Sequence, residues 1–182
     1  MIKYVALLRG VNVGGKNKLD MKELKKAFEA RGFLGVQTYI NSGNVIFSSQ
    51  SADEPALKAE CEAVIRENFG LDIFVALMCA SDLIDAVEHA PVWWNADENS
   101  KHNAIFVIAP MSVEEVFSAV GEIKPEYEKV DFYGRLIFWS APLKTFSRTR
   151  WAKVSGNIVY NDLTIRNPNT VYKLAELLKG EN

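Results

Sequence analysis

The residues whose chemistry is easiest to recognise lie in a glycine-rich, cationic stretch close to the N-terminus. Gly10, Gly15 and Lys16 match the GxxxxGK part of a phosphate-binding loop, in which backbone N–H groups and a lysine bind phosphate. Asn17 stands where such a loop has the Ser or Thr that binds magnesium, and no strand ending in a second magnesium-binding Asp follows. A helix is predicted to open only at Asp20, so the loop does not run straight into a helix N-terminus. The stretch indicates an anion contact or a glycine-permitted turn, and disfavours a nucleotide triphosphatase.

Other side chains with catalytic or metal-binding chemistry lack the necessary spacing. His89 and His102 are the only histidines, and neither has a metal-type spacing with Cys61 or Cys79, so we predict no metal and no cofactor. Neither a GxSxG elbow nor an SxxK pair is present. Cys61 falls on the apolar stripe of a predicted helix, which is typical of a core residue. No catalytic residue is predicted, and whether the protein is an enzyme stays open.

Composition indicates a globular protein of the cytoplasm. The 182 residues are 48% hydrophobic and 24% charged, as in ordinary soluble domains. The apolar run at residues 2–8 is too short for a signal peptide or a membrane span, so no membrane association is expected. Two cysteines indicate reduced thiols rather than a disulfide framework.

Charge is distributed unevenly along the chain. The net charge of −2 argues against a general nucleic-acid coat, which is usually basic. Basic residues dominate two stretches: Arg9, Lys16, Lys18, Lys22, Lys25 and Lys26, and then Arg135, Lys144, Arg148, Arg150, Lys153, Arg166 and Lys173. If these stretches meet in space they create a positive field suited to an anion; otherwise they are two solvated faces.

The first half of the chain reads as strand, helix, strand, strand, helix, strand. The predicted elements are a strand at 2–8, a helix from Asp20 to Gly32, a hairpin of 36–40 and 45–47, a helix opened by Ser51 and closed by Gly70, and a strand at 72–78. This order is the ferredoxin-like arrangement. A third helix is expected over 81–89.

The second half repeats this order. The predicted elements are a strand at 103–109, a helix capped by Ser112 and Glu115, a hairpin of 126–132 and 136–140, a helix over 145–154, a strand at 163–166, and a final helix capped by Asn169. We therefore predict an α+β protein of two tandem ferredoxin-like (βαββαβ) subdomains with antiparallel sheets. Their expected bounds are 1–90 and 103–182, with a connector at 91–102 in which Trp93 and Trp94 pack between the halves.

Three segments stand out as motifs: Tyr4–Gly15 (YVALLRGVNVGG), Thr38–Phe47 (TYINSGNVIF) and Thr164–Val171 (TIRNPNTV). Together they resemble a bacterial family of uncharacterised small proteins that is catalogued as a domain of unknown function. The resemblance covers essentially the full chain in the right order. It implies two ferredoxin-like subdomains and no established activity. Pro168 departs from the family, which more often carries Trp there.

The residues at the positions that the resemblance marks have side chains that donate hydrogen bonds, and none of them is acidic. They are Arg9, Asn12, Asn41, Ser42, Asn44, Arg166, Asn167 and Thr170. Arginine forks and backbone amides suit phosphate or carboxylate groups. We predict that a cleft between the halves binds a small anionic, phosphate-bearing ligand. The predicted ligand-binding residues are Arg9, Asn12, Gly14, Gly15, Lys16, Asn41, Ser42, Lys144, Arg148, Arg166 and Asn167.

Structural roles are the alternative for several of these positions. Asn41 and Asn44 would shape the hairpin, Asn169 or Thr170 would cap a helix, and Arg9 would pair with a structural carboxylate.

Two other functions stay open. A ferredoxin-like sheet can bind single-stranded nucleic acid through exposed aromatic residues, for which Tyr39, Phe47, Phe138 and Trp139 are candidates, although the RNP1 pattern is missing. An open sheet edge would instead serve a protein-interaction or homodimer module. The oligomeric state is not predicted.

Overall fold

The computed structural model describes residues 1–180, which form two compact units. The first unit holds residues 1–84 and the C-terminal residues from Leu174 onward, and the second unit holds Asp85–Lys173. Two helices, α3 (Ala80–Glu88) and α5 (Pro168–Lys179), therefore contribute residues to both units. In the first unit, Nζ of Lys3 donates to the carbonyl oxygen of Gly180, 2.7 Å away, just beyond the last turn of α5.

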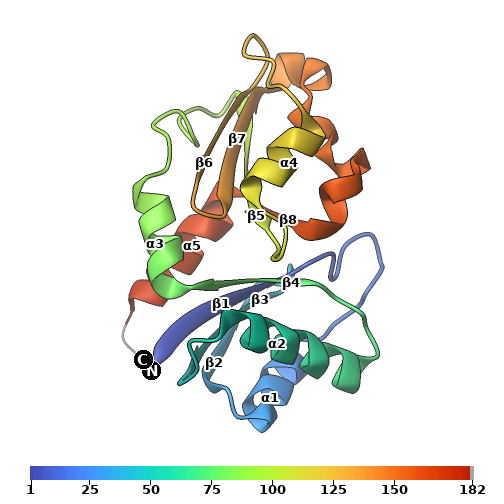
Figure 1. Ribbon diagram of the computed structural model, residues 1–182, viewed down its shortest axis with the longest axis vertical. Helices are drawn as coiled ribbons and strands as arrows, with labels where there is room; N and C mark the ends of the chain where they lie inside the picture. The colour runs from blue at the N-terminus through green and yellow to red at the C-terminus, as the bar shows by residue number, and fades with distance from the viewer. Residues whose placement is uncertain (181–182) are drawn as a thin grey trace. The chain divides into compact units, whose positions relative to one another are not determined.

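The first unit contains a four-stranded antiparallel sheet covered on one face by two helices (Figure 1). Its elements are β1 (Ile2–Leu8), α1 (Met21–Arg31), β2 (Leu34–Tyr39), β3 (Asn44–Ser49), α2 (Glu54–Phe69) and β4 (Val75–Cys79). The strand order is β2-β3-β1-β4, and Ala6 of β1 is opposite both Val45 and Leu77. Phe28 of α1, Ile65 of α2 and the sheet side chains form one buried core.

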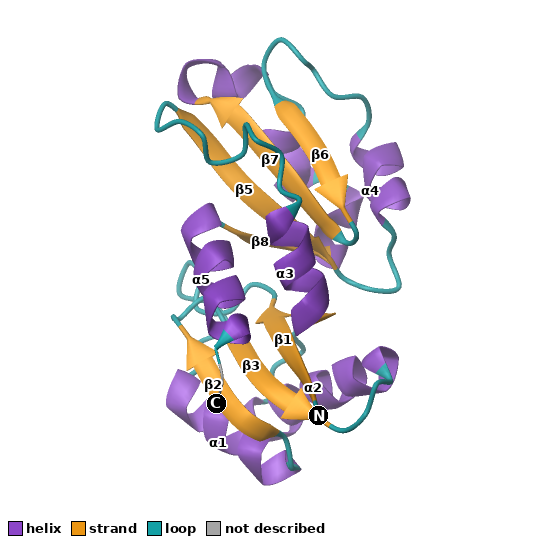
Figure 2. Ribbon diagram, turned by 90° about the vertical axis from the view of Figure 1, so that its left-hand side faces the viewer, coloured by secondary structure: helices purple, strands orange, loops and turns teal. Residues whose placement is uncertain are grey.

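The second unit has the same strand order with different connections (Figure 2). Its elements are β5 (Ser100–Val107), α4 (Val113–Val120), β6 (Lys129–Tyr133), β7 (Leu136–Pro142), the 3₁₀ helices η1 (Leu143–Arg148), η2 (Trp151–Gly156) and η3 (Ile158–Asp162), and β8 (Leu163–Arg166). The sheet is antiparallel, in the order β6-β7-β5-β8. The prediction of an α+β protein with antiparallel sheets is confirmed.

The helix boundaries follow from capping chemistry. The Asp20 carboxylate accepts hydrogen bonds from the N–H groups of Lys22 and Glu23, which are orphan donors in the first turn of α1. Gly32 ends α1 in the left-handed conformation, with φ of 101°. Ser112 and Glu115 form the predicted capping box of α4. These signals were correctly read from the sequence.

Two predicted caps are wrong by two residues. Asp53, not Ser51, caps α2, because its side chain accepts from the N–H of Ala56 while Ser51 Oγ accepts from the N–H of Asp53. Asn167, not Asn169, caps α5: its Oδ1 accepts from the N–H of Thr170, 2.9 Å away. In both helices a proline occupies the first turn, where its missing N–H costs nothing.

The helix predicted over residues 145–154 is replaced by the 3₁₀ turns η1 and η2. The N–H groups of Arg150 and Trp151 donate to the Glu128 carboxylate, each over 2.9 Å. Because those two amides are used outside the segment, an α-helical ladder cannot continue through it. Thr149 Oγ1 also bonds to the carbonyl oxygen of Phe146, which favours a local turn.

Across residues 1–180 no helix has the length and the apolar character needed to cross a membrane.

Candidate anion-binding site

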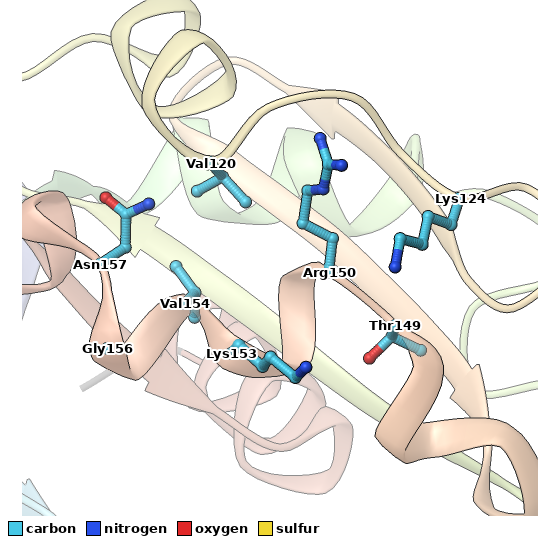
Figure 3. A pocket seen from close by; sticks show the side chains of 8 residues that line it. All are labelled: Val120, Lys124, Thr149, Arg150, Lys153, Val154, Gly156 and Asn157. Carbon is cyan, nitrogen blue, oxygen red and sulfur yellow. The ribbon is translucent and has the colours of Figure 1, made fainter.

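The second unit contains a cavity of about 380 Å³ at the end of α4 (Figure 3). It is lined by Val120, Lys124, Thr149, Arg150, Lys153, Val154, Gly156 and Asn157. None of these lining residues is acidic. Lys124, Arg150 and Lys153 bring three positive charges to the lining of the cavity. The volume lies within the usual range for small-molecule sites, roughly 300–1,000 Å³.

A buried carboxylate positions the two segments that carry these cations. Glu128 is 2% exposed and accepts four hydrogen bonds. Oε1 accepts from the N–H groups of Lys124 (3.3 Å) and Arg150 (2.9 Å), and Oε2 accepts from the N–H of Trp151 (2.9 Å) and the indole of Trp139 (3.1 Å). Four donors stabilise the buried carboxylate. Glu128 therefore holds the backbones of Lys124 and Arg150 next to each other.

The Arg150 guanidinium packs directly over Gly121. A Cβ atom at Gly121 would lie 2.7 Å from Arg150 Nη1, which is closer than any real Cβ contact. Gly121 also has a φ of 90°, which L side chains rarely adopt. The turn therefore favours glycine at position 121, and a side chain there would displace the flexible guanidinium of Arg150.

The other polar side chains of the cavity are already engaged. Asn157 Nδ2 donates to the carbonyl oxygen of Ala119, and its Oδ1 accepts from the N–H of Val159. Lys124 Nζ donates to the carbonyl oxygen of Arg148, 3.1 Å away. By contrast, no carboxylate within residues 1–180 forms an ion pair with Arg150 or Lys153. Clustered cations repel each other, and a bound anion would relieve that repulsion.

The glycine-rich stretch after β1 forms a tight turn. Gly14 and Gly15 have φ of 58° and 76°, and the N–H of Lys16 donates to the carbonyl oxygen of Val13. The turn closes on itself before α1 begins at Met21, as expected from the poor match to a phosphate loop. Lys16 remains exposed to solvent.

Asn12 joins this stretch to the hairpin between β2 and β3. Its Nδ2 donates to the carbonyl oxygens of Leu19 and Asn41, both 2.9 Å away, and its Oδ1 accepts from the N–H of Leu19. All polar atoms of the Asn12 side chain are therefore used within the protein. The structure supports a structural role for Asn12 and brings it together with Asn41.

The hairpin turn itself packs under the same stretch. Asn44 is fully buried, and its Nδ2 donates to the carbonyl oxygen of Tyr39 and to Ser42 Oγ. The carbonyl oxygen of Gly43 accepts from the N–H of Leu8. A Cβ at Gly43 would collide with Val11 and Leu8. The first two sequence motifs therefore meet in one packed structural feature.

Two of the predicted arginines lie at strand ends in different units: Arg9 directly follows the central strand β1, and Arg166 is the last residue of the edge strand β8. Arg9 follows β1, and its N–H donates to the carbonyl oxygen of Phe74. Arg166 ends β8 and is buried, with Nη1 donating to Thr164 Oγ1 (2.8 Å) and to the carbonyl oxygen of Ile165 (2.9 Å). Burial lowers the pKa of Arg166 to about 10.

Lys144 and Arg148 lie on η1, in the segment that leads into the cavity. Both are exposed, and neither side chain lines the cavity; the Arg148 guanidinium lies over the Tyr127 ring. Their neighbours Arg150 and Lys153 do line it, and both belong to the basic stretch noted in the sequence. Sequence reasoning missed Lys124 and Glu128: Glu128 was expected inside a strand over 126–132, whereas both residues lie in the link between α4 and β6.

The aromatic residues considered for base stacking are largely buried. Phe47 and Phe138 have no exposed surface, and Trp139 is 2% exposed. Trp94 packs edge-on against Phe138 and donates its indole N–H to the carbonyl oxygen of Asn103. These rings serve as core residues within the units that contain them.

Comparisons with known proteins give a family and a related structure. Residues 1–138 match the protein family described as "Protein of unknown function (DUF1697)". The chain is also similar to a solved structure, that of conserved bacterial protein SP0830 from Streptococcus pneumoniae, with 30% sequence identity and a TM-score of 0.88. That similarity covers 98% of this chain and 99% of the other. No match was found among curated proteins.

Proposed function

The chain belongs to the DUF1697 family of proteins of unknown function, and we propose that it binds a small anionic, phosphate-bearing ligand in the cavity of its second unit. One observation carries the proposal. Arg150 and Lys153 line a cavity without an acidic lining residue, and no carboxylate within residues 1–180 pairs with them.

The chemistry of these side chains favours a phosphate-bearing ligand. An arginine fork donates two parallel hydrogen bonds to a phosphate or carboxylate, and a lysine adds a point charge. Phosphate groups carry up to two negative charges near neutral pH, which matches two unpaired cations better than a single carboxylate does. A cytoplasmic location fits this ligand class, and the free thiols of Cys61 and Cys79 support a reducing compartment.

The connectivity supports a ferredoxin-like topology for both units. Each has the strand order expected when two βαβ halves interleave, β2-β3-β1-β4 and β6-β7-β5-β8. In the second unit the 3₁₀ turns take the place of the second helix. The cavity of this unit is lined by residues of η2 and of the link between η1 and η2, from Thr149 to Gly156.

A titration with inorganic phosphate and pyrophosphate, followed by amide NMR shifts or calorimetry, tests the proposal. The double variant Arg150→Gln/Lys153→Gln should lose at least tenfold in affinity, since each lost charged hydrogen bond is worth about 1.5–3 kcal/mol. The matched control is Lys16→Gln/Lys18→Gln, which removes the same charge from the glycine-rich turn. If the control loses binding while the cavity variant keeps it, the cavity is not the site and the cleft predicted around Arg9 and Lys16 is favoured instead.

Single-stranded nucleic acid is the second candidate ligand, because it shares the phosphate chemistry. Its binding should fall steeply between low and moderate salt, since counterions are released. A small phosphate compound bound in a cavity should keep most of its affinity over that range. Affinity for a short single-stranded RNA, but not for pyrophosphate, would contradict the small-ligand proposal.

A further inference from the structure

The second unit contains another cavity whose lining has the opposite charge. Its volume is about 270 Å³, and its walls come from the link between α3 and β5, the link between α4 and β6, and the strand β7. The lining includes three acidic residues, Asp97, Glu126 and Glu128, and one basic residue, Lys129. It shares no residue with the lining that contains Arg150 and Lys153. An excess of negative charge favours a positively charged ligand here.

Glu128 brings to this cavity a buried charge without a counter-ion. It is 2% exposed, and the four hydrogen bonds that its oxygens accept come from neutral groups, three backbone N–H groups and the indole of Trp139. No Lys, Arg or His side chain of residues 1–180 forms an ion pair with it. Glutamate is rarely buried in proteins unless an opposite charge accompanies it. A cation in the cavity would supply that opposite charge.

Asp97 and Glu126 carry negative charge at more exposed positions of the lining. Asp97 Oδ2 lies 4.0 Å from Nε2 of His102, but the hydrogen bonds of this ring are those of a neutral imidazole. Nδ1 accepts from the N–H of Asn95 over 3.1 Å, and Nε2 donates to the carbonyl oxygen of Asp97 over 2.8 Å. Within residues 1–180, neither Glu126 nor Lys129 forms an ion pair. The protein therefore does not neutralise these two carboxylates with a cation of its own.

Aromatic rings give the cavity a second means of binding a cation. Trp93 and Tyr127 line it, together with Pro125 and Pro142. The face of an aromatic ring attracts cations, and tryptophan does so most strongly. The Arg148 guanidinium already lies over the Tyr127 ring, 5.5 Å from its centroid, which leaves Trp93 for a ligand. Rings and prolines also suit an alkyl chain, whereas a bare divalent metal ion prefers a shell of oxygen ligands.

We propose that this cavity binds a small alkylammonium ion, that is, a protonated primary amine with a short carbon chain. An ammonium group has three N–H donors and no acceptor. The carboxylates of Asp97 and Glu126 and the Ser140 hydroxyl, which also lines the cavity, offer oxygen acceptors, and Trp93 contacts the chain. Typical small-molecule sites hold about 300–1,000 Å³, so this smaller cavity limits the ligand to a few carbon atoms.

Titration of the full chain with butylammonium chloride and with 1-butanol, followed by amide NMR shifts, tests the need for a positive charge. The two probes have the same carbon chain and differ in the head group. Butylammonium should shift the amides of residues 93–100 and 126–129, and should bind about tenfold more tightly than 1-butanol or better, because charged hydrogen bonds are stronger. Equal affinities, no binding of butylammonium, or shifts confined to other parts of the chain would overturn the proposal.

Variants test the acidic lining. The double variant Asp97→Asn/Glu126→Gln should lose about tenfold in butylammonium affinity or more, because two carboxylates become neutral amides of nearly the same shape. The matched control is Glu114→Gln/Glu122→Gln, which removes the same charge from exposed positions in the same unit outside the cavity. An unchanged affinity in the folded double variant, or an equal loss in the control, overturns the proposal.

Two further measurements keep the test decisive. Trp93→Leu keeps an apolar side chain but removes the ring, so butylammonium affinity should fall about threefold or more while 1-butanol affinity changes little. Equal losses for both probes would exclude a cation–π contact and count against the proposal. Glu128 is left unchanged because it also positions Arg150. If a variant fails to fold, the comparison of butylammonium with 1-butanol on the wild type decides.

Discussion

The side-chain amide of Asn12 donates to the backbone carbonyl oxygen of Asn41, 2.9 Å away, and so ties the glycine-rich turn to the first hairpin. The sequence shows these residues as parts of two separate motifs, while the structure makes them one feature of the first unit. Several residues of these two motifs therefore serve to pack the glycine-rich turn against the hairpin between β2 and β3.

Replacing Asn12 by Gly should lower the free energy of unfolding by about 1.5–4.5 kcal/mol, because three hydrogen bonds are lost at about 0.5–1.5 kcal/mol each. Glycine keeps the positive φ of 54°, so the variant isolates the amide. Urea unfolding measures the change. Asn17→Gly is the control, since Asn17 also has a positive φ but only one exposed side-chain hydrogen bond. Equal losses in the two variants would contradict the proposed role of Asn12.

Gly43→Ala should be much more damaging than Gly70→Ala. Both glycines have a left-handed φ, which costs an L residue about 1–2 kcal/mol. Only at Gly43 would the new Cβ also overlap neighbours, with Leu8 Cβ 2.8 Å away, so a total loss of about 3–5 kcal/mol is expected. The difference between the two denaturation midpoints checks this prediction. Losses within about 0.5 kcal/mol of each other would show that the hairpin can move away from β1.

The sequence predicted the regular elements well because their signals are local. Helix caps such as Asp20 and Gly32 act within one turn, and the hydrophobic periods of α1 and β1 are visible without neighbours. The segment around Thr149 could not be predicted. Its conformation depends on Glu128, more than twenty residues away, which draws the amides of Arg150 and Trp151 out of a helical ladder.

The candidate site was predictable only as a charge pattern. Arg150 and Lys153 belong to a recognisable basic stretch, but nothing local indicates that Lys124 joins them. Asn12 and Asn167, which the sequence predicts as ligand-binding residues, form hydrogen bonds inside the protein, as a link between two turns and as a helix cap, and their role in ligand binding stays a prediction. Arg9 and Lys16 as ligand-binding residues stay a prediction. Asparagine is difficult to assign from sequence because the same amide serves turns, caps and ligands.

The Cys61 thiol should make stability depend on alkaline pH. Burial raises the pKa of Cys61 far above its usual range in the folded state, whereas in the unfolded chain the thiol ionises near pH 8.5. The unfolded state therefore loses a proton first, and the free energy of unfolding falls as the pH rises above about 8.5, by up to about 1.4 kcal/mol per pH unit. Cys61→Ala lacks this contribution.

The measurement is urea unfolding of the wild type and Cys61→Ala between pH 7 and 10, with Cys79 present in both. The wild type should be more stable at pH 7, because the variant leaves a small cavity, and the gap should narrow with rising pH. A constant gap over this range would show that Cys61 ionises equally in both states.

Gly121→Ala should weaken phosphate binding without touching a ligand directly. Its Cβ would lie 2.7 Å from Arg150 Nη1, so the guanidinium must move away from its place over the turn. A misplaced arginine loses a charge-assisted hydrogen bond, for which we expect roughly a tenfold loss of pyrophosphate affinity. Gly134→Ala is the control, because Gly134 also has a positive φ, of 55°, in the same unit and has open space around its Cβ.

A double-mutant cycle separates this effect from general strain. In an Arg150→Gln background, Gly121→Ala should cause no further loss of affinity, because the group that it displaces is already gone. Calorimetric titration of the wild type, the two single variants and the double variant measures the coupling. If the losses of affinity in the two single variants add up in the double variant, Gly121 acts through the backbone of the turn. If Gly121→Ala binds pyrophosphate as tightly as the wild type, Arg150 does not belong to the proposed site.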